Sequence, residues 1–236
     1  KKTKQKESSL YLCAPVNALV EGIFEENIHI GKVLEHGDFG LGTFDDLDGE
    51  MLVLDGNCYQ ISSDGKILRV DEHVLTPFAA VTFYKPGNHY ELRRKTRHKN
   101  FQGWLNTLLP SPNVFYAIRI EGEFAHIKAR SVPKQANYHP LSNIAHDQVL
   151  FEFENIQGTL AGFFTPDFMS SLSVPGLHLH FISADFMHGG HVLECIPHTV
   201  TAGIQMISKL ELSLPLSRDY MNCNFNHNSK TELGKI

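Results

Sequence analysis

The chain has 236 residues, enough for one large domain or two smaller domains that share a core. Its hydrophobic fraction of 42% and charged fraction of 20% are typical of a globular protein. The formal net charge of -5 argues against a main role in binding nucleic acid or an anionic membrane.

The chain begins with a polar stretch, Lys1–Ser9, which lacks the apolar region of a signal peptide. We therefore expect a cytoplasmic protein. The absence of an initial methionine leaves a processed or exported form as the alternative. No later run approaches the roughly 18 consecutive apolar residues of a membrane-spanning helix, so we expect no membrane insertion.

The first expected elements are helices. Ala14–Glu26 places apolar residues on one helical face, and Pro15 suits a first turn. The residues on that face are Val16, Leu19, Val20, Ile23 and Phe24. A shorter helix is expected over Ile30–His36, ending at Gly37.

A group of strands follows, separated by turn residues such as Asp48-Gly49 and Asp55-Gly56. Their apolar or alternating patterns predict strands at Phe39–Phe44, Glu50–Leu54, Cys58–Ile61, Ile67–Val70 and Pro77–Tyr84.

Helical spacing returns at Phe101–Leu109, and Pro110 ends that pattern. Phe115–Ile120 and Glu123–Arg130 are expected to form an antiparallel pair that turns at Glu121-Gly122. The remaining expected strands are Thr159–Phe164, Leu177–Ser183, His191–Ile196 and Val200–Leu214, the last as one or two strands. Many strands with few helices predict a mixed, strand-rich α/β or α+β class, with a division near residues 130–155.

The segment Gly176–Cys195 has the most informative pattern. Alternation along a strand places His178 and His180 on one side. A turn through Gly189-Gly190 would return the chain, so that His191 lies beside them on an antiparallel neighbour. Three converging neutral imidazoles suit tetrahedral zinc with one position left for water or substrate. From spacing alone, ordinary hydrogen-bonded histidines explain the pattern equally well.

Two charged residues at strand ends are further candidates. For Glu50, a solvated strand-end carboxylate is favoured by position, and the functional alternative is a proton-transfer group with a raised pKa. Arg130 lies on the polar side of its strand. It faces solvent there or, alternatively, binds a substrate carboxylate with its planar fork.

The basic run Arg93–Lys99 is more typical of a solvated segment than of a nucleic-acid site, since no aromatic platform accompanies it. The four cysteines, Cys13, Cys58, Cys195 and Cys223, form no C-x-x-C pair. Buried thiols are favoured over a disulfide or a thiolate ligand. Cys195 lies four residues after His191, so regular alternation would place it on the same strand face, where it could close a structural zinc site.

Five stretches, in order, resemble the α-acetolactate decarboxylase family. They are HGDFGLGTFDDLDGE at 36–50, LPSPNVFYAIRIEGEF at 109–124, ARSVPKQ at 129–135, GTLAGFFTP at 158–166, and GLHLHF with GGHVLE at 176–194. Together they cover nearly the whole chain from about Tyr11.

The resemblance implies zinc bound by His178, His180 and His191, catalytic roles for Glu50 and Arg130, and a substrate-binding role for Thr43. It also implies two α/β domains, each built on a sheet, at about residues 10–140 with Glu50 and Arg130 and 141–236 with the histidines. Members of the family form dimers, so a homodimer is expected. The family uses a glutamate close to the C-terminus; Glu232 is the nearest acid, and that role is not assigned to it.

The implied activity is decarboxylation of 2-acetolactate to (R)-acetoin and carbon dioxide. In the mechanism that we hypothesise, zinc is a Lewis acid that stabilises an enediolate, while Glu50 and Arg130 orient the substrate and manage protons. Two alternatives are another histidine-ligated metal enzyme, such as an iron oxygenase, and a zinc-containing domain that binds a small acid without turnover.

Overall fold

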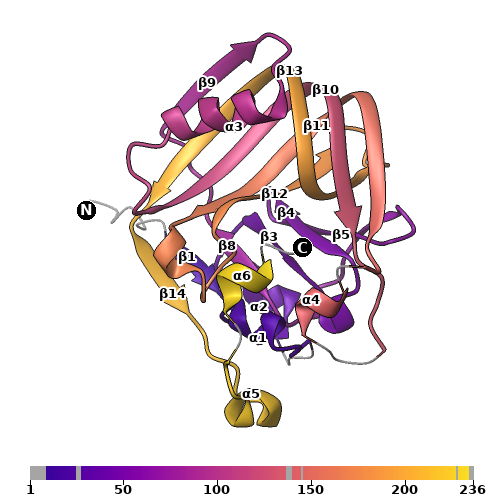
Figure 1. Cartoon of the computed structure of the whole chain (residues 1–236), viewed down its shortest axis with the longest axis vertical. Helices are drawn as coiled ribbons and strands as arrows, with labels where there is room; N and C mark the ends of the chain where they lie inside the picture. Colours follow the sequence, from indigo (N-terminus) through magenta and orange to yellow (C-terminus); the bar gives the residue numbers. More distant parts are fainter. Residues whose placement is uncertain (1–8, 25–27, 137–139, 145, 227, 234–236) are drawn as a thin grey trace, which may run out of the picture.

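Six short strands from the first half of the chain and one strand from near its end assemble into a mixed sheet of seven strands (Figure 1). The computed structural model describes residues 9–24, 28–136, 140–144, 146–226 and 228–233. The strand order is β14-β1-β8-β3-β4-β5-β6, and β14 pairs in parallel with β1. The bounds are β1 Ser9–Leu12, β3 Phe39–Thr43, β4 Glu50–Leu54, β5 Asn57–Ile61, β6 Ile67–Arg69, β8 Ala79–Thr82 and β14 Lys209–Leu212.

A second sheet has five antiparallel strands in the order β10-β11-β12-β13-β9. An additional pairing of β10 with β13 closes four of these strands on themselves. Their bounds are β9 Asn88–Arg93, β10 Phe115–Ser131, β11 Val149–Thr165, β12 Gly176–Ser183 and β13 Gly189–Ile207. A small separate ladder joins β2, Ile28–His29, to β7, Leu75–Thr76.

The described helices are short. The longest described helix, α3, packs against β13 of the second sheet, whereas α1, α4 and α6 pack against one another (Figure 1). None of the described helices is long and apolar enough to cross a membrane. The bounds are α1 Asn17–Val20, α2 Ile30–Leu34, α3 His98–Thr107, α4 Leu141–Ile144, α5 Arg218–Asn222 and α6 Ser229–Leu233, with 3₁₀ turns at Asp45–Leu47 and Asp167–Met169.

The two sheets share a hydrophobic core. Leu41 and Ile61 from the first sheet lie in one buried cluster with Ala161 and Ile182 from the second. The rings of Phe39 and Phe163 meet edge to face across this contact, with centroids 5.9 Å apart. A second cluster fills the space between α3 and the other side of the five-stranded sheet. The strand-rich mixed class is therefore confirmed.

Most predicted strands are present at or near their expected positions, but the first predicted helix is too long. Only Asn17–Val20 is helical, because the chain turns at Gly22, which has a φ of +88°. The apolar residues of the predicted helical face are nevertheless all buried, since the turn also directs Ile23 and Phe24 inward. The predicted end at Glu26 lies outside the described residues.

The predicted turn at Glu121-Gly122 is wrong. β10 runs unbroken through both residues, and Gly122 pairs with Gly158 on one side and Val200 on the other. Gly122 has a φ of +145°, and a Cβ there would lie 2.2 Å from the carbonyl oxygen of Thr199. Glycine is required here because a neighbouring strand approaches closely. From the sequence alone, such a glycine cannot be distinguished from the glycine of a hairpin turn.

The predicted domain division between residues 140 and 141 stays a prediction. The sheets themselves exchange strands across that point: β9 and β10 precede it but belong to the five-stranded sheet. In the other direction, β14 follows the division yet completes the seven-stranded sheet beside β1.

Replacing Gly122 with alanine should lower the free energy of unfolding by about 1–3 kcal/mol or more, because the side chain adds backbone strain and a clash with Thr199. Urea unfolding of both proteins measures this difference. Gly103→Ala is the matched control: Gly103 lies inside α3 with open space around its Cβ position, so alanine should stabilise the fold by about 0.4–1 kcal/mol. Equal effects of the two substitutions would contradict the assigned role of Gly122.

Candidate metal centre and active site

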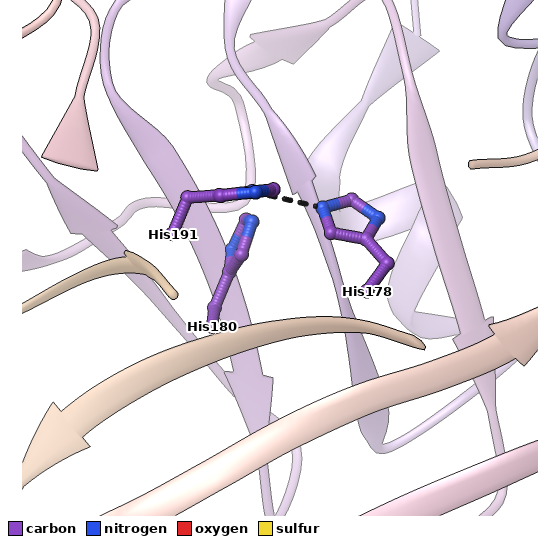
Figure 2. A group of neighbouring side chains, drawn as sticks. All are labelled: His178, His180 and His191. Atoms are coloured by element: carbon purple, nitrogen blue, oxygen red, sulfur yellow. Dashed lines mark hydrogen bonds between the residues drawn. The ribbon is translucent and has the colours of Figure 1, made fainter. Parts of the chain in front are cut away.

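Three histidines converge on one side of β12 and β13. His178 and His180 alternate along β12, and His180 lies directly opposite His191 of β13 (Figure 2). One ligand atom from each ring lies within 4.8 Å of the others. The strand alternation and the antiparallel return predicted from sequence are therefore present. The predicted turn at Gly189-Gly190 is wrong, because both glycines already pair with β12 and the chain turns at residues 184–188. His188, in contrast, lies on the turn, where its ring packs against Phe153.

The ring of His180 has a defined hydrogen-bonding state. Its Nδ1 donates to the backbone carbonyl of Met51 at 2.7 Å, so Nδ1 carries the proton, because a carbonyl oxygen can only accept. The other nitrogen, Nε2, is buried and has no hydrogen-bond partner among the described residues. Its lone pair therefore points into the site. A ring fixed through one nitrogen while the other remains bare is the usual arrangement of a metal-binding histidine.

The other two rings fit the same interpretation. His178 Nε2 lies 3.2 Å from His191 Nδ1, close to the roughly 3.3–3.4 Å that separates two ligand nitrogens on a tetrahedral zinc ion. Burial lowers the pKa of both rings well below 6.5, and the nearby Arg130 and the neighbouring rings lower it further. Burial likewise lowers the pKa of His180 to about 4. All three rings are thus neutral at neutral pH, as metal binding requires.

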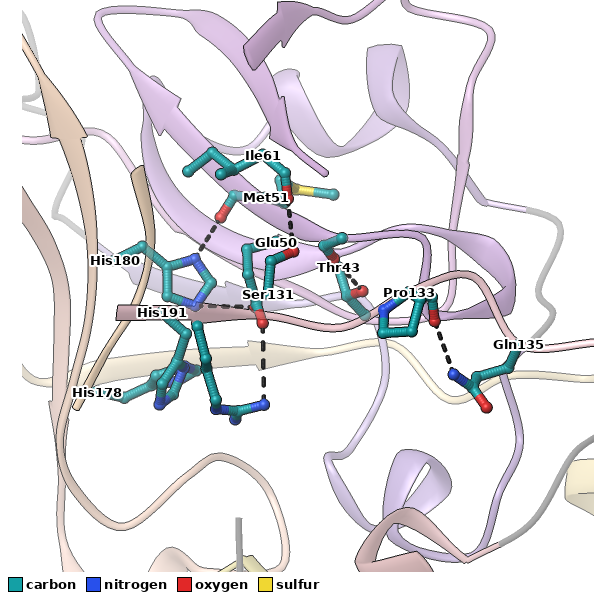
Figure 3. A network of polar contacts seen from close by, with 12 residues as sticks. Thr43, Glu50, Met51, Ile61, Ser131, Pro133, Gln135, His178, His180 and His191 are labelled. Atoms are coloured by element: carbon teal, nitrogen blue, oxygen red, sulfur yellow. Dashed lines mark hydrogen bonds and ion pairs between the residues drawn. The ribbon is translucent and has the colours of Figure 1, made fainter. Parts of the chain in front are cut away.

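Glu50 begins β4 and lies at the same site (Figure 3). Its Oε2 is 3.4 Å from His180 Nε2, and its Oε1 is 4.0 Å from Nη1 of Arg130. Only 7% of Glu50 is exposed, so it is not the solvated strand-end acid that its position favoured. Burial raises the pKa of Glu50 to about 7, and the opposing effect of Arg130 is smaller. Near neutral pH this carboxyl group can therefore both hold and release a proton.

Arg130 places a positive charge inside the protein. Only 6% of the residue is exposed, and its Nε is buried without a hydrogen-bond partner among the residues that the structure describes. The contact with Glu50, at 4.0 Å, is too long for a hydrogen bond. A buried guanidinium with unused donors is costly unless an anion satisfies it, so this position is suited to a carboxylate.

Thr43 pairs with Glu50 across strands β3 and β4. Its hydroxyl donates a hydrogen bond to the carbonyl of Gly49 at 2.8 Å, and this bond stabilises the turn that leads into Glu50. The hydroxyl proton is thus in use, but the oxygen can still accept a hydrogen bond from a ligand. Thr43 is buried and lines the cavity, and its substrate-binding role stays a prediction.

One cavity of about 130 Å³ connects all six predicted site residues. A water molecule needs about 10–15 Å³ of such volume, so the cavity can hold a small organic acid. Its wall also includes apolar side chains that the sequence analysis did not place at the site. These are Val16, Leu19, Leu47, Phe78, Val132, Leu141, Val174 and Leu233. Several come from α1, α4 and α6, whose meeting the sequence did not reveal. Glu232, next to Leu233 on α6, is buried.

Cys195 does not share the face of His191, contrary to the expectation from alternation. Ala129 pairs with Val192 and Lys128 with Glu194, so Leu193 is an extra residue that forms a β-bulge. The bulge reverses the alternation, and Cys195 lies in the apolar cluster on the opposite side of the sheet. The four cysteines all lie within the described ranges and form no disulfide with one another, as favoured from their spacing.

Hydrogen bonds tie the two sheets together around the cavity (Figure 3). Ser131, at the end of β10, donates to the carbonyl of Ile61 at 2.9 Å, and the Gly49 amide donates to the carbonyl of Val132 at 3.1 Å. These bonds, with that of His180 to Met51, join β10 and β12 of one sheet to β4 and β5 of the other. The carboxyl, guanidinium and imidazole groups are therefore held on a rigid frame.

Known proteins are similar to this chain in sequence and fold. The family model described as "Alpha-acetolactate decarboxylase" matches residues 10–227. A protein of that name from Methanosarcina mazei is 40% identical over 228 residues, which cover 96% of this chain and 79% of the relative. One from Bacillus licheniformis is 35% identical over 218 residues, covering 92% and 86%. The crystal structure of the Bacillus subtilis strain 168 protein superposes with a TM-score of 0.93 at 33% identity, covering 96% of this chain and 98% of the other.

In the metal-free protein, Glu50→Gln should increase the free energy of unfolding at pH 8 by on the order of 3 kcal/mol. The folded-state pKa is raised from 4.5 to about 7, so wild-type Glu50 opposes folding once it ionises above its unfolded pKa. The difference should shrink as the pH falls through 7 and vanish below about 4.5. Urea unfolding at several pH values measures it.

The control is Glu152→Gln, an exposed carboxylate on β11, which should change stability by less than about 0.5 kcal/mol at each pH. If Glu50→Gln behaved in the same way, Glu50 would not be a desolvated acid.

Proposed function

Since the chain belongs to the α-acetolactate decarboxylase family, a family of carboxy-lyases, we propose that it converts 2-acetolactate to (R)-acetoin and carbon dioxide with zinc as its metal. The family model and the relatives confirm the resemblance that the five sequence motifs indicated. The observation that carries the proposal is the meeting of three neutral imidazoles, a buried carboxyl group and a buried guanidinium in one small cavity.

His178, His180 and His191 would hold the zinc ion. Three imidazole ligands with a further position open are typical of catalytic zinc, whereas closed structural sites have four protein ligands and usually contain cysteine. The bare Nε2 of His180 supports this assignment, as does the absence of Cys195 from that face. When bound, zinc supplies a Lewis acid that stabilises negative charge developing on the substrate oxygens.

Arg130 would bind the carboxylate of acetolactate. The planar guanidinium can donate two parallel hydrogen bonds to a carboxylate, and its buried position makes such bonds stronger than in water. Apolar side chains line most of the remainder of the cavity.

Glu50 would supply the proton that completes the reaction. The bond between the tertiary carbon and the carboxylate breaks, carbon dioxide leaves, and the electron pair passes into the neighbouring ketone. Protonation of the same tertiary carbon then gives acetoin. A carboxyl group with a pKa of about 7 can donate this proton at neutral pH and recover it from solvent.

The positions of these groups also support a single product enantiomer. Glu50 and Thr43 lie on strands β4 and β3 of the seven-stranded sheet, whereas Arg130 and the histidines belong to the five-stranded sheet. A proton delivered from the Glu50 side reaches only one face of the planar carbon. Thr43, whose hydroxyl proton is already donated to Gly49, would accept a hydrogen bond from the substrate hydroxyl. The homodimer that the resemblance implies stays a prediction.

The direct test follows acetoin on a chiral column after incubation with racemic acetolactate. Zinc-loaded protein should produce one enantiomer, (R)-acetoin. Removal of zinc should abolish production, and added zinc should restore it. His178→Ala should lose bound zinc and activity together, because two imidazoles remain. Restoration by iron but not by zinc would favour the other metal enzyme, and bound zinc without acetoin would favour the acid-binding domain.

Glu50→Gln should retain zinc while kcat falls by about 10²–10⁴, the contribution of a positioned proton donor. Metal content and steady-state kinetics measure the two properties separately. Glu152→Gln, which removes an exposed carboxylate from β11, should leave kcat unchanged. Wild-type turnover by Glu50→Gln would remove Glu50 from the proton transfer.

A further inference from the structure

The side of the sheet that His191 faces depends on the β-bulge at Leu193. Arg130 and His191 pair on the cavity side, and after the bulge Ile127 and Cys195 pair on the apolar side. A one-residue shift in strand register moves every side chain to the opposite face. Were Leu193 drawn into regular pairing, the segment that carries His191 would shift relative to Arg130, and its imidazole would turn away from the cavity.

At this bulge, the edge of β13 that faces away from β10 has no neighbouring strand among the described residues. β12 covers that edge only as far as His191, and β9 begins to cover it at Thr199. Between these strands, the segment that leads into α3 takes their place: the Thr96 amide donates to the carbonyl of Pro197 at 3.0 Å. The amide of Cys195 donates to Nδ1 of His98 at 3.1 Å. A histidine side chain therefore replaces a strand neighbour two residues after the bulge.

His98 is firmly placed for this contact. It is the first residue of α3, which is anchored behind β13 by the buried side chains of Phe101 and Leu105. With Leu193 and Cys195, His98 lines a small apolar cavity on the side of the sheet away from the metal centre. Since Nδ1 accepts from a backbone amide, this nitrogen is unprotonated. The hydrogen bond fixes Cys195, and thereby the bulge between Cys195 and His191.

We propose that His98 is a positioning residue for the metal centre: by accepting the Cys195 amide hydrogen bond it holds the bulge that directs His191 into the cavity. The proposal rests on the proposed metal-binding role of the three histidines. His98 touches neither metal nor substrate, so its effect should appear in metal affinity and in the local protection of β13.

The test compares His98→Phe, which keeps a ring but removes the acceptor, with His98→Asn, whose Oδ1 can accept the same hydrogen bond. Zinc affinity is measured by competition with a chromophoric chelator, and protection of the Cys195 amide by hydrogen exchange. His98→Phe should bind zinc about 3- to 10-fold more weakly, as expected for loss of one hydrogen bond, and exchange the Cys195 amide about tenfold faster. His98→Asn should restore both to within about twofold of wild type.

Leu105→Val serves as the matched control, because it loosens the packing of α3 without removing the acceptor. It should lower stability while leaving zinc affinity unchanged. Equal loss of zinc affinity in Leu105→Val and His98→Phe would show that His98 acts only through helix packing and would overturn the proposal. A zinc affinity of His98→Phe equal to that of the wild type would also overturn the proposal.

Wild-type protein that binds no zinc would instead contradict the proposed function, so the two failures are distinguishable. If His98→Phe does not fold, His98→Asn alone decides through the Cys195 amide. Protection retained within about twofold supports the acceptor role, and loss of about tenfold contradicts it.

Discussion

The hydrogen bond from His180 Nδ1 to the carbonyl of Met51 is the contact on which the centre depends. Its donor lies on β12 and its acceptor on β4, so one bond joins the two sheets. It also fixes the tautomer, leaving Nε2 bare toward the cavity. Because Met51 directly follows Glu50, the same contact sets the distance between the imidazole and the carboxyl group. This one hydrogen bond therefore sets the orientation of the His180 ring, its protonation state and the position of the Glu50 carboxyl group.

The buried charges explain why the surrounding frame must be rigid. Glu50 and Arg130 lie 4.0 Å apart, close enough to influence one another and too far for a hydrogen-bonded ion pair. A tighter pair would satisfy the guanidinium and lower the pKa of the acid, and neither group would then be available to a ligand. The fold instead holds both groups partly unsatisfied, at a cost in stability that the shared core and the bonds between the sheets offset.

Sequence patterns predicted the parts of the site that depend on simple alternation. His178 and His180 share a face because they are two residues apart on a strand, and the chain returns through residues 184–188 to place His191 beside them. Cys195 was misplaced because an extra residue, Leu193, breaks the alternation, and no property of leucine marks a bulge. Gly122 was misread for a related reason: a glycine required by a neighbouring strand resembles one required by a turn. Val16 and Leu19 were not recognised as part of the cavity wall because burial against a cavity and burial in a core give the same helical pattern.

The residues of the centre come from segments that lie far apart in the sequence, so the centre depends on the complete fold. Glu50 comes from the seven-stranded sheet, Arg130 from the first strand of the closed set in the second sheet, and the histidines from its later strands. The last strand, β14, then returns to the first sheet beside β1. Contacts between such distant segments cost loop-closure entropy, which the many other contacts of the fold offset. A metal ion bound by the three imidazoles would therefore stabilise both sheets together, because His180 is bonded to one sheet while it belongs to the other.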